Sequence, residues 1–378
     1  MRTRRVKLKV AMSGASLAAV AIRPRQTELK ELPIPDIPAD AGLLRVIATG
    51  ICGSDWPMYL SERPGPRILG HEMIGVIEKL GDTAQERWGV KEGDFVALEE
   101  YLPCGHCESC RTGEYRACMG TDRRLPGTVR YGSTPISKPP SLWGGYSQYL
   151  YLHPNSIFHR VPCEMPPHIA AMALPIGNGF QWVYLDGGAG PGKTVLIQGP
   201  GQQGLGCVIA AKASGADKII VTGLRRDEKR LAVARALGAD NAIVADEEDV
   251  AQAVANLTGN RMADIVVESS GAGPNIINTS LALLGRGGAL LVASRVGGPV
   301  PNFDVDRILA FRLSLRALRG HSYQAVELAL RTMASGAFAL DQMSSHVVGL
   351  ADVDAALRMV GGESEERSIH VTVEPWKT

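Results

Sequence analysis

The chain has 378 residues, and its 40 basic and 39 acidic side chains give a formal net charge of +1. This length is too great for one ordinary core and favours about two domains. Near-neutrality argues against nucleic acid as the main partner, and no apolar run reaches the roughly 20 residues needed to span a bilayer.

The N-terminal segment, MRTRRVKLKVAMSGASLAAVAI, is basic and then mildly apolar. A signal peptide begins in the same way, but no clear cleavage site follows, and the apolar part continues into a plausible first strand. Met12 is an alternative start, which would make residues 1–11 an extension. The seven cysteines, four of them clustered, indicate metal chemistry in a reducing cytoplasm rather than a disulfide framework.

Residues 43–161 contain short apolar runs broken by Gly and Pro, a pattern that predicts an irregular β-rich domain. After residue 166, apolar runs such as TVLIQG, KIIVTG, ADIVVES and GALLVAS alternate with Ala-rich helical stretches. Continuous apolar strands separated by helices predict a parallel sheet that is covered on both faces, so the fold class is α/β. Two more helices and a closing strand, SIHVTVEP, follow residue 318.

A glycine-rich turn joins the first of these strands to a helix, with Gly199, Gly201 and Gly204 in the spacing G-x-G-x-x-G. The first glycine makes the tight turn, the second lets the backbone approach a pyrophosphate, and the third lets the helix pack on the strand. The helix N-terminus then offers free N–H groups to the phosphates. We therefore predict a dinucleotide site here.

The next strand ends at Gly223, where an NAD-binding domain would place an acidic residue on the ribose hydroxyls. Without that carboxylate, Arg225 or Arg226 could pair with the 2′-phosphate of NADP. The alternative is that both arginines are solvated charges in the first turn of the following helix. We favour NADP and keep NAD as the alternative.

Four cysteines, Cys104, Cys107, Cys110 and Cys118, lie within fifteen residues in the spacing C-x2-C-x2-C-x7-C. Four thiolates close a tetrahedral shell around zinc and leave no open position. This pattern predicts a structural zinc lobe at about residues 100–120.

Two further motifs lie upstream: GICGSD, which contains Cys52, Ser54 and Asp55, and LGHEMIGVIEKLG, which contains His71 and Glu72. With the cysteine lobe, GGYSQY, the glycine-rich turn, RLAVARALGAD and the closing strand, the chain resembles the zinc-dependent alcohol dehydrogenases of the medium-chain dehydrogenase/reductase family. The likeness runs from about residue 34 to the C-terminus. It implies a GroES-like catalytic domain beside a doubly wound Rossmann-type domain.

The resemblance implies a catalytic zinc on Cys52 and His71, with Glu72 able to enter its shell and Asp55 behind the histidine. Ser54 falls where the family places the hydroxyl that passes on the alcohol proton. The remaining ligand departs from the family pattern, because family members supply a Cys or Glu just before the coenzyme domain. One alignment places Asn178 there and another places Pro175, and neither is a strong zinc ligand.

We therefore expect Cys52, His71 and Glu72 to hold this zinc, with Asn178 nearby as a weak ligand or as a hydrogen-bond partner of bound water. His370 occupies the position where the family usually has Lys or Arg near the cofactor phosphates. The other unassigned histidines are expected to be surface or packing residues, and Cys163 and Cys207 isolated thiols. Three aromatic residues could either line the substrate pocket or pack in the core: Trp56, Tyr59 and Trp143.

Taken together, the sequence predicts a catalytic domain at residues 1–165 and 319–378 and a dinucleotide-binding domain at 166–318. The expected activity is zinc-dependent hydride transfer between a nicotinamide cofactor and a small alcohol, aldehyde or ketone. The resemblance also implies a cytoplasmic homo-oligomer, a dimer or tetramer. Two alternatives remain: a zinc-independent reductase of enoyl or quinone substrates on the same fold, and a non-enzymatic dinucleotide-binding protein that keeps only the structural zinc.

Overall fold

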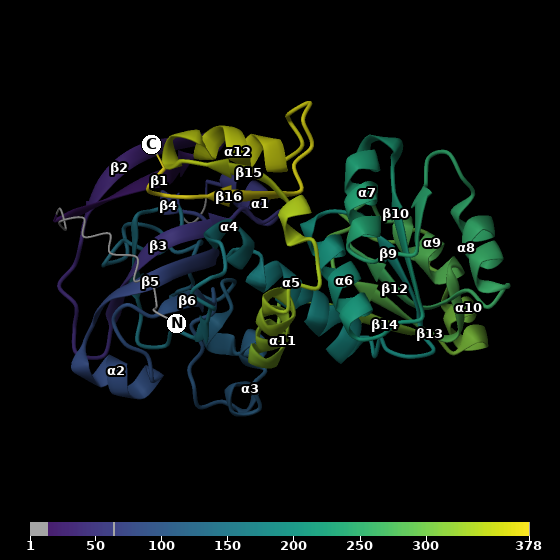
Figure 1. Ribbon diagram of the computed structural model, residues 1–378, viewed down its shortest axis with the longest axis horizontal. Coiled ribbons are helices and arrows are strands. Elements are labelled where there is room, and N and C mark those ends of the chain that lie inside the picture. Colours follow the sequence, from purple (N-terminus) through teal and green to yellow (C-terminus); the bar gives the residue numbers. More distant parts are fainter. Residues whose placement is uncertain (1–13, 63–64, 378) are drawn as a thin grey trace.

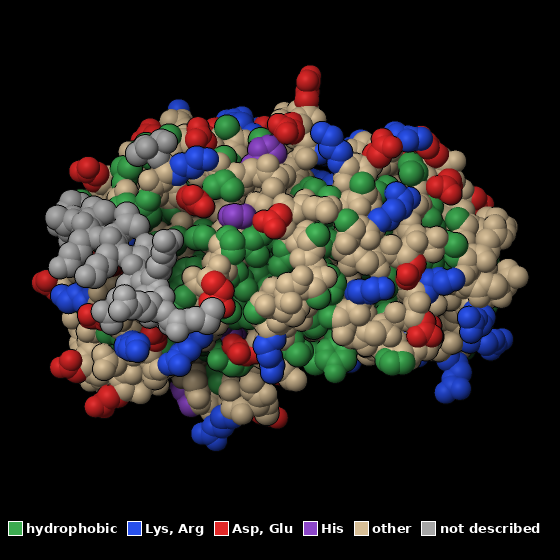
Figure 2. All heavy atoms as spheres, in the orientation of Figure 1, with side chains coloured by type: hydrophobic (Ala, Val, Ile, Leu, Met, Phe, Trp, Pro, Cys, Tyr) green, Lys and Arg blue, Asp and Glu red, His purple; other side chains and the backbone are tan. Residues whose placement is uncertain are grey.

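The structure is a computed structural model that describes residues 14–62 and 65–377 (Figure 1). Two lobes lie side by side, one made mainly of the N-terminal half and one of the green and teal middle of the chain. The question of a start at Met12 falls outside the described residues. Within them, no helix is long and apolar enough to cross a membrane. Basic and acidic side chains are interspersed over the face in Figure 2, as the net charge of +1 leads one to expect.

The first lobe is β-rich, and its larger sheet has the strand order β15-β16-β3-β5-β6-β8, with β7 paired to β3. The strands of this sheet are β3 (Gly42–Gly50), β5 (Glu72–Leu80), β6 (Phe95–Leu98), β7 (Tyr149–Leu152), β8 (Phe158–Arg160), β15 (Ser344–Val348) and β16 (His370–Val373). A smaller sheet, β2-β1-β4, packs beside it and consists of β1 (Ala15–Arg23), β2 (Gln26–Pro33) and β4 (Arg67–Ile68). The short helices of this lobe are α1 (Asp55–Tyr59), α2 (Asp82–Trp88), α3 (Glu108–Arg111), η1 (Tyr115–Ala117), η2 (Met119–Thr121), η5 (Leu340–Gln342), η6 (Leu350–Asp352) and α12 (Val353–Val360).

The second lobe is a six-stranded, wholly parallel sheet in the order β11-β10-β9-β12-β13-β14. Its strands are β9 (Thr194–Gln198), β10 (Lys218–Gly223), β11 (Asn241–Val244), β12 (Ala263–Glu268), β13 (Leu284–Val292) and β14 (Ser314–Ala317). The helices between them are α6 (Gln202–Ala213), η4 (Arg225–Asp227), α7 (Glu228–Ala236), α8 (Val250–Thr258), α9 (Ile276–Ala282) and α10 (Val305–Phe311). This is the doubly wound topology, and the strand order reverses between β9 and β12, where such folds bind ligands.

The central strand β9 is apolar from Val195 to Ile197 because both faces of the sheet are covered at this strand. Val195 and Ile197 pack into the core on one face of the sheet, and Leu196 packs into the separate core on the other face. All three side chains are fully buried. A strand covered on both faces is apolar in its middle, and the buried polar residue at its end, Gln198, accepts a hydrogen bond from Ser280. The predicted α/β fold class with a parallel sheet is confirmed.

The two lobes meet at helices α4 (Pro167–Ala170), α5 (Ala173–Gly179), the π-helical η3 (Phe180–Asp186) and α11 (Tyr323–Ala334). Helix α5 lies very close to α6, because a Cβ on Gly179 would stand 2.2 Å from the carbonyl oxygen of Gly206. A Cβ on Gly206 would likewise stand 2.8 Å from the carbonyl oxygen of Pro175. Two glycines thus bring the stretch IGNGF, with Asn178, against the helix that follows the glycine-rich turn.

Candidate active site

The predicted ligands Cys52, His71 and Glu72 come together between the lobes, with one ligand atom from each lying within 4.8 Å of the others. Cys52 follows β3 and the other two open β5, and the antiparallel pairing of Gly50 with Glu72 closes the 19-residue gap between them. The pairing requires a glycine, because a Cβ on Gly50 would lie 2.3 Å from Glu72 Oε2.

Asp55 fixes the orientation of this cluster from behind. Its Oδ1 lies 3.1 Å from His71 Nδ1, and its Oδ2 accepts from the Cys52 N–H at 3.0 Å and from the Tyr146 hydroxyl at 2.8 Å. A histidine whose Nδ1–H is held by a carboxylate presents Nε2 as the free ligand atom. Burial alone would lower the pKa of His71, but the charges of Asp55 and Glu100 outweigh it and raise that pKa well above its ordinary value.

Within the part of the chain that the structure describes, Glu72 has a hydrogen-bond partner at only one of its two oxygens. Its Oε1 accepts from Gln202 Nε2 at 3.2 Å, while its buried Oε2 has no hydrogen-bond partner among the described residues. Burial raises the pKa of Glu72 to about 8, against the opposing charge of His71 and with the help of Asp55. A thiol, an imidazole and an unmet carboxylate oxygen form a donor set that suits Zn²⁺. The residues present therefore fit the metal.

Ser54 lies beside the same ligand atoms. Its Oγ is 3.3 Å from Cys52 Sγ and 3.3 Å from His71 Nε2, and the side chain is partly exposed. A partly exposed hydroxyl in this place can contact both the cluster and a molecule that approaches from solvent.

Asn178 and Pro175, the two candidates for the remaining ligand, are placed differently. Asn178 Oδ1 lies 2.8 Å from His321 Nδ1, and its Nδ2 donates to Gln203 Oε1 at 3.1 Å. Both ends of the amide thus have protein partners. Pro175 directs its carbonyl towards Gly206 in α6, so it packs the two helices together.

The four lobe cysteines also form a tight cluster, with their sulfur atoms within 4.8 Å of one another. The sulfur atoms of Cys107 and Cys110 are 3.4 Å apart, and those of Cys104 and Cys110 are 3.9 Å apart. A zinc–sulfur distance of about 2.3 Å in a tetrahedron sets such separations near about 3.8 Å. Hydrogen bonds from the backbone of His106 and Cys107 lower the pKa of Cys104 to about 6, which favours the thiolate. This set fits a closed zinc site.

The three glycines of the turn meet three different steric demands. Gly199 has φ +98°, and a Cβ there would lie 2.8 Å from Ser270 Cα. A Cβ on Gly204 would lie 1.9 Å from the carbonyl oxygen of Gly199, whereas one on Gly201 would enter open space. Gly201 therefore leaves the approach to the N-terminus of α6 clear, as a bound pyrophosphate requires.

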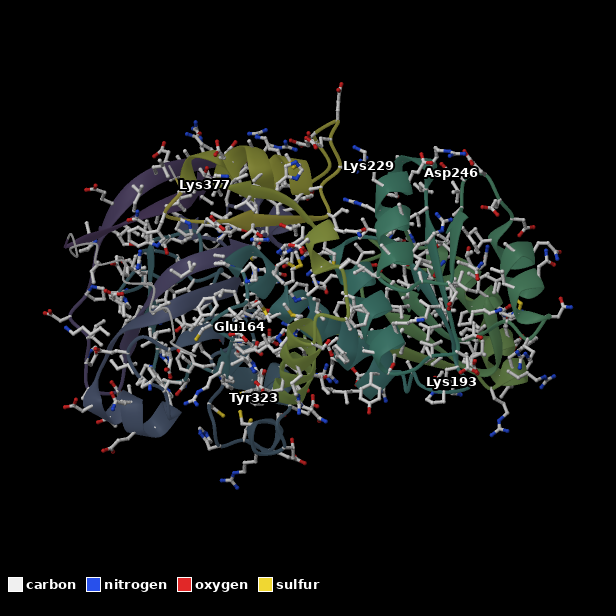
Figure 3. The ribbon with its side chains drawn as sticks, viewed as in Figure 1. Glu164, Lys193, Lys229, Asp246, Tyr323 and Lys377 are labelled. Atoms are coloured by element: carbon white, nitrogen blue, oxygen red, sulfur yellow. The ribbon has the colours of Figure 1, made fainter. Side chains whose placement is uncertain are left out.

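Three residues that we expected near the cofactor, Arg225, Arg226 and His370, differ in burial and in their partners. Arg225 forms an ion pair with Glu247, and its backbone N–H donates to Asp246, which Figure 3 labels. Arg226 is exposed. His370 is fully buried, and its Nδ1 lies 2.9 Å from Gln202 Oε1 in the glycine-rich turn. His370 thus reaches this turn through a glutamine.

A row of ionisable groups that no sequence motif indicates lies next to Asn178. Glu99 is fully buried, with Oε1 3.1 Å from His159 Nε2 and Oε2 2.9 Å from His321 Nε2. The row continues from His159 Nδ1 to Glu327 at 2.8 Å. Two histidines that we expected only on the surface or in packing therefore share one carboxylate. No spacing motif joins residues 99, 159 and 321, so only the fold could reveal the row.

The three aromatic residues considered for the substrate pocket pack mainly within the protein. Tyr59 and Trp143 are buried in the core of the first lobe, and Tyr59 donates to Asp354. Trp56 covers Gly361, where an added Cβ would lie 2.4 Å from the indole. Tyr323, labelled in Figure 3, stacks on His159 at 4.4 Å between ring centroids.

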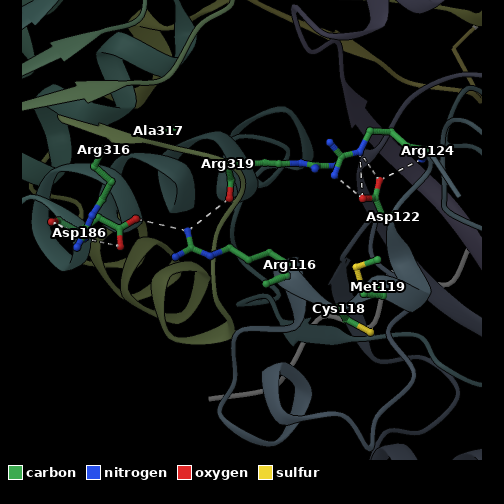
Figure 4. A pocket seen from close by; sticks show the side chains of 10 residues that line it. Arg116, Cys118, Met119, Asp122, Arg124, Asp186, Arg316, Ala317 and Arg319 are labelled. Atoms are coloured by element: carbon green, nitrogen blue, oxygen red, sulfur yellow. Dashed lines mark hydrogen bonds and ion pairs between the residues drawn. The ribbon is translucent and has the colours of Figure 1, made fainter.

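A separate hollow of about 490 Å³ lies between the cysteine lobe and the end of β14 (Figure 4). Asp186 pairs there with Arg116 and Arg316, and Asp122 pairs with Arg124. The lining of this hollow is basic, with four arginines against two aspartates, and it includes none of the predicted ligands in the Cys52 cluster. The Cys52 cluster therefore remains the better candidate active site.

Comparison with known proteins agrees with this geometry. Residues 38–163 match the model of the alcohol dehydrogenase GroES-like domain, and residues 204–335 match that of the zinc-binding dehydrogenase. A probable alcohol dehydrogenase of Mycobacterium tuberculosis is 35% identical over 358 residues, which cover 93% of this chain and 96% of the relative. The chain belongs to the zinc-binding alcohol dehydrogenase family.

Other members of the zinc-binding alcohol dehydrogenase family are similar to this chain. A sorbitol dehydrogenase of Bacillus subtilis is 35% identical, with 75% of this chain and 76% of the relative covered. A solved alcohol dehydrogenase from Thermotoga maritima superimposes with a TM-score of 0.84 at 26% identity, covering 96% of this chain and 99% of that one. These matches confirm the predicted family, fold and enzyme class, an oxidoreductase of alcohols, and favour neither alternative.

Proposed function

We propose that Cys52, His71 and Glu72 hold a catalytic zinc ion with which the protein oxidises an alcohol, or reduces the matching carbonyl compound. The observation that supports this most strongly is Glu72 Oε2, a buried carboxylate oxygen beside a thiol and an imidazole for which the described part of the chain offers no hydrogen-bond partner. Glu72 supplies the anionic third ligand that neither Asn178 nor Pro175 can. Three protein ligands leave the fourth position for substrate.

When bound there, zinc would act as a Lewis acid on the substrate oxygen while the nicotinamide exchanges hydride with the substrate carbon. The protein supplies the surrounding groups. Asp55 keeps the Nδ1–H of His71 in place, and Ser54, within 3.3 Å of two ligand atoms, accepts the hydroxyl proton of the alcohol and passes it towards solvent. Asn178, held between His321 and Gln203, stands by as a hydrogen-bond partner of bound water or as a weak ligand.

For the cofactor, we propose NADP in preference to NAD. Gly223 removes the carboxylate that would repel a 2′-phosphate, and Arg226 is exposed with its charge available. Arg225 is already paired with Glu247, although an exposed pair of this kind is weak. Arg226→Ala should weaken NADPH at least about 10-fold more than NADH in a fluorescence titration, since a charge-assisted contact contributes about 1.5–3 kcal/mol. Equal weakening of both cofactors would mean that Arg226 does not read the 2′-phosphate.

We further propose a homo-oligomer, dimer or tetramer, that forms through the edge of the coenzyme sheet. Strand β14 is the edge strand, and apolar side chains are exposed on it and on α10, among them Leu309 at 78% and Leu315 at 44%. An unpaired apolar edge invites strand pairing, which a symmetric dimer would satisfy. Light scattering at micromolar concentration tests this, and a monomer would contradict it.

The domain division at residues 165 and 318 and a cytoplasmic location remain our proposals. The parallel sheet begins at Thr194 and ends at Ala317, and β15 and β16 return to the sheet that contains β3. All seven cysteines are free thiols, as zinc ligands in a reducing compartment would be.

Metal content tests the central proposal. We expect two zinc ions per chain in the wild type, and one in each of Cys52→Ser and Cys110→Ser. The first variant should lose alcohol oxidation and keep its thermal stability, whereas the second should lose stability, because a structural zinc contributes to folding. Cys163→Ser, at an exposed thiol outside both clusters, is the control. Full metal content and activity in Glu72→Gln would contradict the ligand set and favour the zinc-independent reductase.

A further inference from the structure

Two of the three variable residues of the glycine-rich turn are glutamines, and each reaches out of the nucleotide-binding lobe. Gln202 is the first residue of α6, whose N-cap Gly201 provides no side-chain cap. The first N–H groups of the helix are therefore available to an anionic ligand. The side chains of Gln202 and Gln203 go to different partners, Glu72 and Asn178.

Gln202 uses both ends of its amide, and it is buried. Its Nε2 donates to Glu72 Oε1 at 3.2 Å, and its Oε1 lies 2.9 Å from His370 Nδ1. Burial lowers the pKa of His370 to about 4, so the ring is neutral with a single proton. With Gln202 Oε1 towards the ring, that proton lies on Nδ1, because an amide oxygen can only accept. The same amide directs its N–H towards Glu72.

The position of the Glu72 carboxylate depends on this contact. Oε2 has no partner among the described residues, and Gly50 approaches it so closely that a Cβ there would lie at 2.3 Å. The same Cβ would lie 2.7 Å from His370 Cε1, so Gly50 also packs against the histidine. Gln202 is therefore the hydrogen-bond donor that decides which oxygen of Glu72 is taken and which is left for a metal.

We propose that Gln202 is a positioning residue that couples zinc binding in the cleft to dinucleotide binding at the glycine-rich turn. It begins the helix that holds the pyrophosphate, and it fixes the candidate zinc ligand Glu72. A pyrophosphate at the N-terminus of α6 would fix the backbone of Gln202, and a zinc ion on Glu72 would fix the acceptor of its side chain. Each ligand thus favours the placement of Gln202 that the other needs, so the coupling is positive. Linkage requires each to tighten the other by the same factor. This inference rests on the proposed cleft zinc.

The experiment measures binding rather than turnover. The cleft site is emptied with a mild chelator and titrated with Zn²⁺ against a competing dye, with and without saturating NADPH, and with NADH in parallel. We expect the cofactor to tighten this zinc about 5- to 50-fold. Zinc should tighten NADPH, followed by its fluorescence, by the same factor. Co²⁺ in the cleft should also change its visible absorption when NADPH binds.

Two matched variants locate the coupling. Gln202→Met keeps the length of the side chain and removes both hydrogen bonds, and the factor should fall to about 1. Gln203→Met changes the neighbouring glutamine, which contacts Asn178 instead, and should keep the wild-type factor. Coupling that survives in Gln202→Met, or is lost equally in both variants, would overturn the assignment.

The wild type gives a decision even if Gln202→Met does not fold. Two zinc ions per chain with no effect of NADPH or NADH on the weaker one would overturn the coupling and leave the proposed function intact. A wild type that takes up only the lobe zinc, with or without cofactor, would instead overturn the proposed cleft zinc.

Discussion

Glu72 and Glu99 are buried glutamates at the same end of one sheet, yet their chemistry is opposite. Glu72 precedes Met73 and Glu99 follows Leu98, two residues that pair across β5 and β6. Glu72 has one donor, from Gln202, and an orphan oxygen, and burial raises its pKa to about 8. For Glu99, burial alone would raise the pKa, but His321 and His159 reverse the effect and lower it well below the ordinary value.

The difference lies in which partners the fold provides. Both oxygens of Glu99 are taken, one by His321 and the other by His159 and by the Tyr115 hydroxyl at 2.6 Å. This carboxylate is satisfied within the protein, so it serves stability. Glu72 is equally buried but unsatisfied, so it needs a cation from outside. Burial alone does not identify a functional carboxylate. A buried carboxylate with an oxygen that has no hydrogen-bond partner in the described residues is the better candidate.

The largest expected effect is on stability at Glu99. Glu99→Gln removes the charge between two buried histidines, and we expect the free energy of unfolding to fall by about 3–5 kcal/mol in a urea titration. The matched change Glu72→Gln in zinc-free protein should cost less than about 1 kcal/mol, since burial raises the pKa of that carboxyl to about 8 and a largely neutral carboxyl loses little charge in this change. Equal losses in the two variants would remove the distinction between the two glutamates.

The second prediction concerns metal affinity at Asp55. Asp55→Asn leaves His71 without its carboxylate partner, so zinc in the cleft should bind about 10- to 100-fold more weakly, as for other groups behind metal ligands. Zinc in the cysteine lobe should be unchanged, which competition with a chelator can measure in the same sample. An unaltered cleft affinity would mean that Asp55 only supports the fold.

The third prediction concerns the pH dependence of the Glu99 row. Burial alone would lower the pKa of His159, but Glu327 and Glu99 raise it, so its contribution is complete below about 6.5 and is lost as the pH rises through the folded-state value. The carboxylates Glu99 and Glu327 have lowered pKa values, so their contribution is lost only in acid. The stability difference between wild type and Glu99→Gln should therefore shrink between pH 6 and pH 9. A constant difference would show that the row is not ionised as proposed.

The smallest effect is expected at Tyr115. Tyr115→Phe removes one donor from Glu99 while both histidines remain, so the free energy of unfolding should fall by about 1 kcal/mol. Zinc content and cofactor affinity should stay as in the wild type. A loss as large as that of Glu99→Gln would show that the hydroxyl, rather than the histidines, satisfies the carboxylate.

The sequence by itself determined the features that depend on short spacings. The four lobe cysteines, the glycine-rich turn and the alternation of apolar strands with helices each lie within a few turns or strands of the chain, so their patterns are visible without the fold. The family match then followed from motifs in order. Cys52 lies in one short motif, and His71 and Glu72 lie in another. The family resemblance assigned all three to one site, and a single strand pairing joins the two motifs in the structure.

Only the tertiary structure decided how those residues are satisfied. Contacts between residues up to 168 positions apart determine which oxygen of Glu72 accepts from Gln202 and which has no partner among the described residues. Such contacts also determine the partners of Asn178. His159 and His321 lie on distant segments, and nothing in their local sequence indicates a shared carboxylate. The physical reason is that the stability of a buried polar atom depends on whether it has a hydrogen-bond partner. Tertiary packing, rather than spacing along the chain, brings that partner into contact.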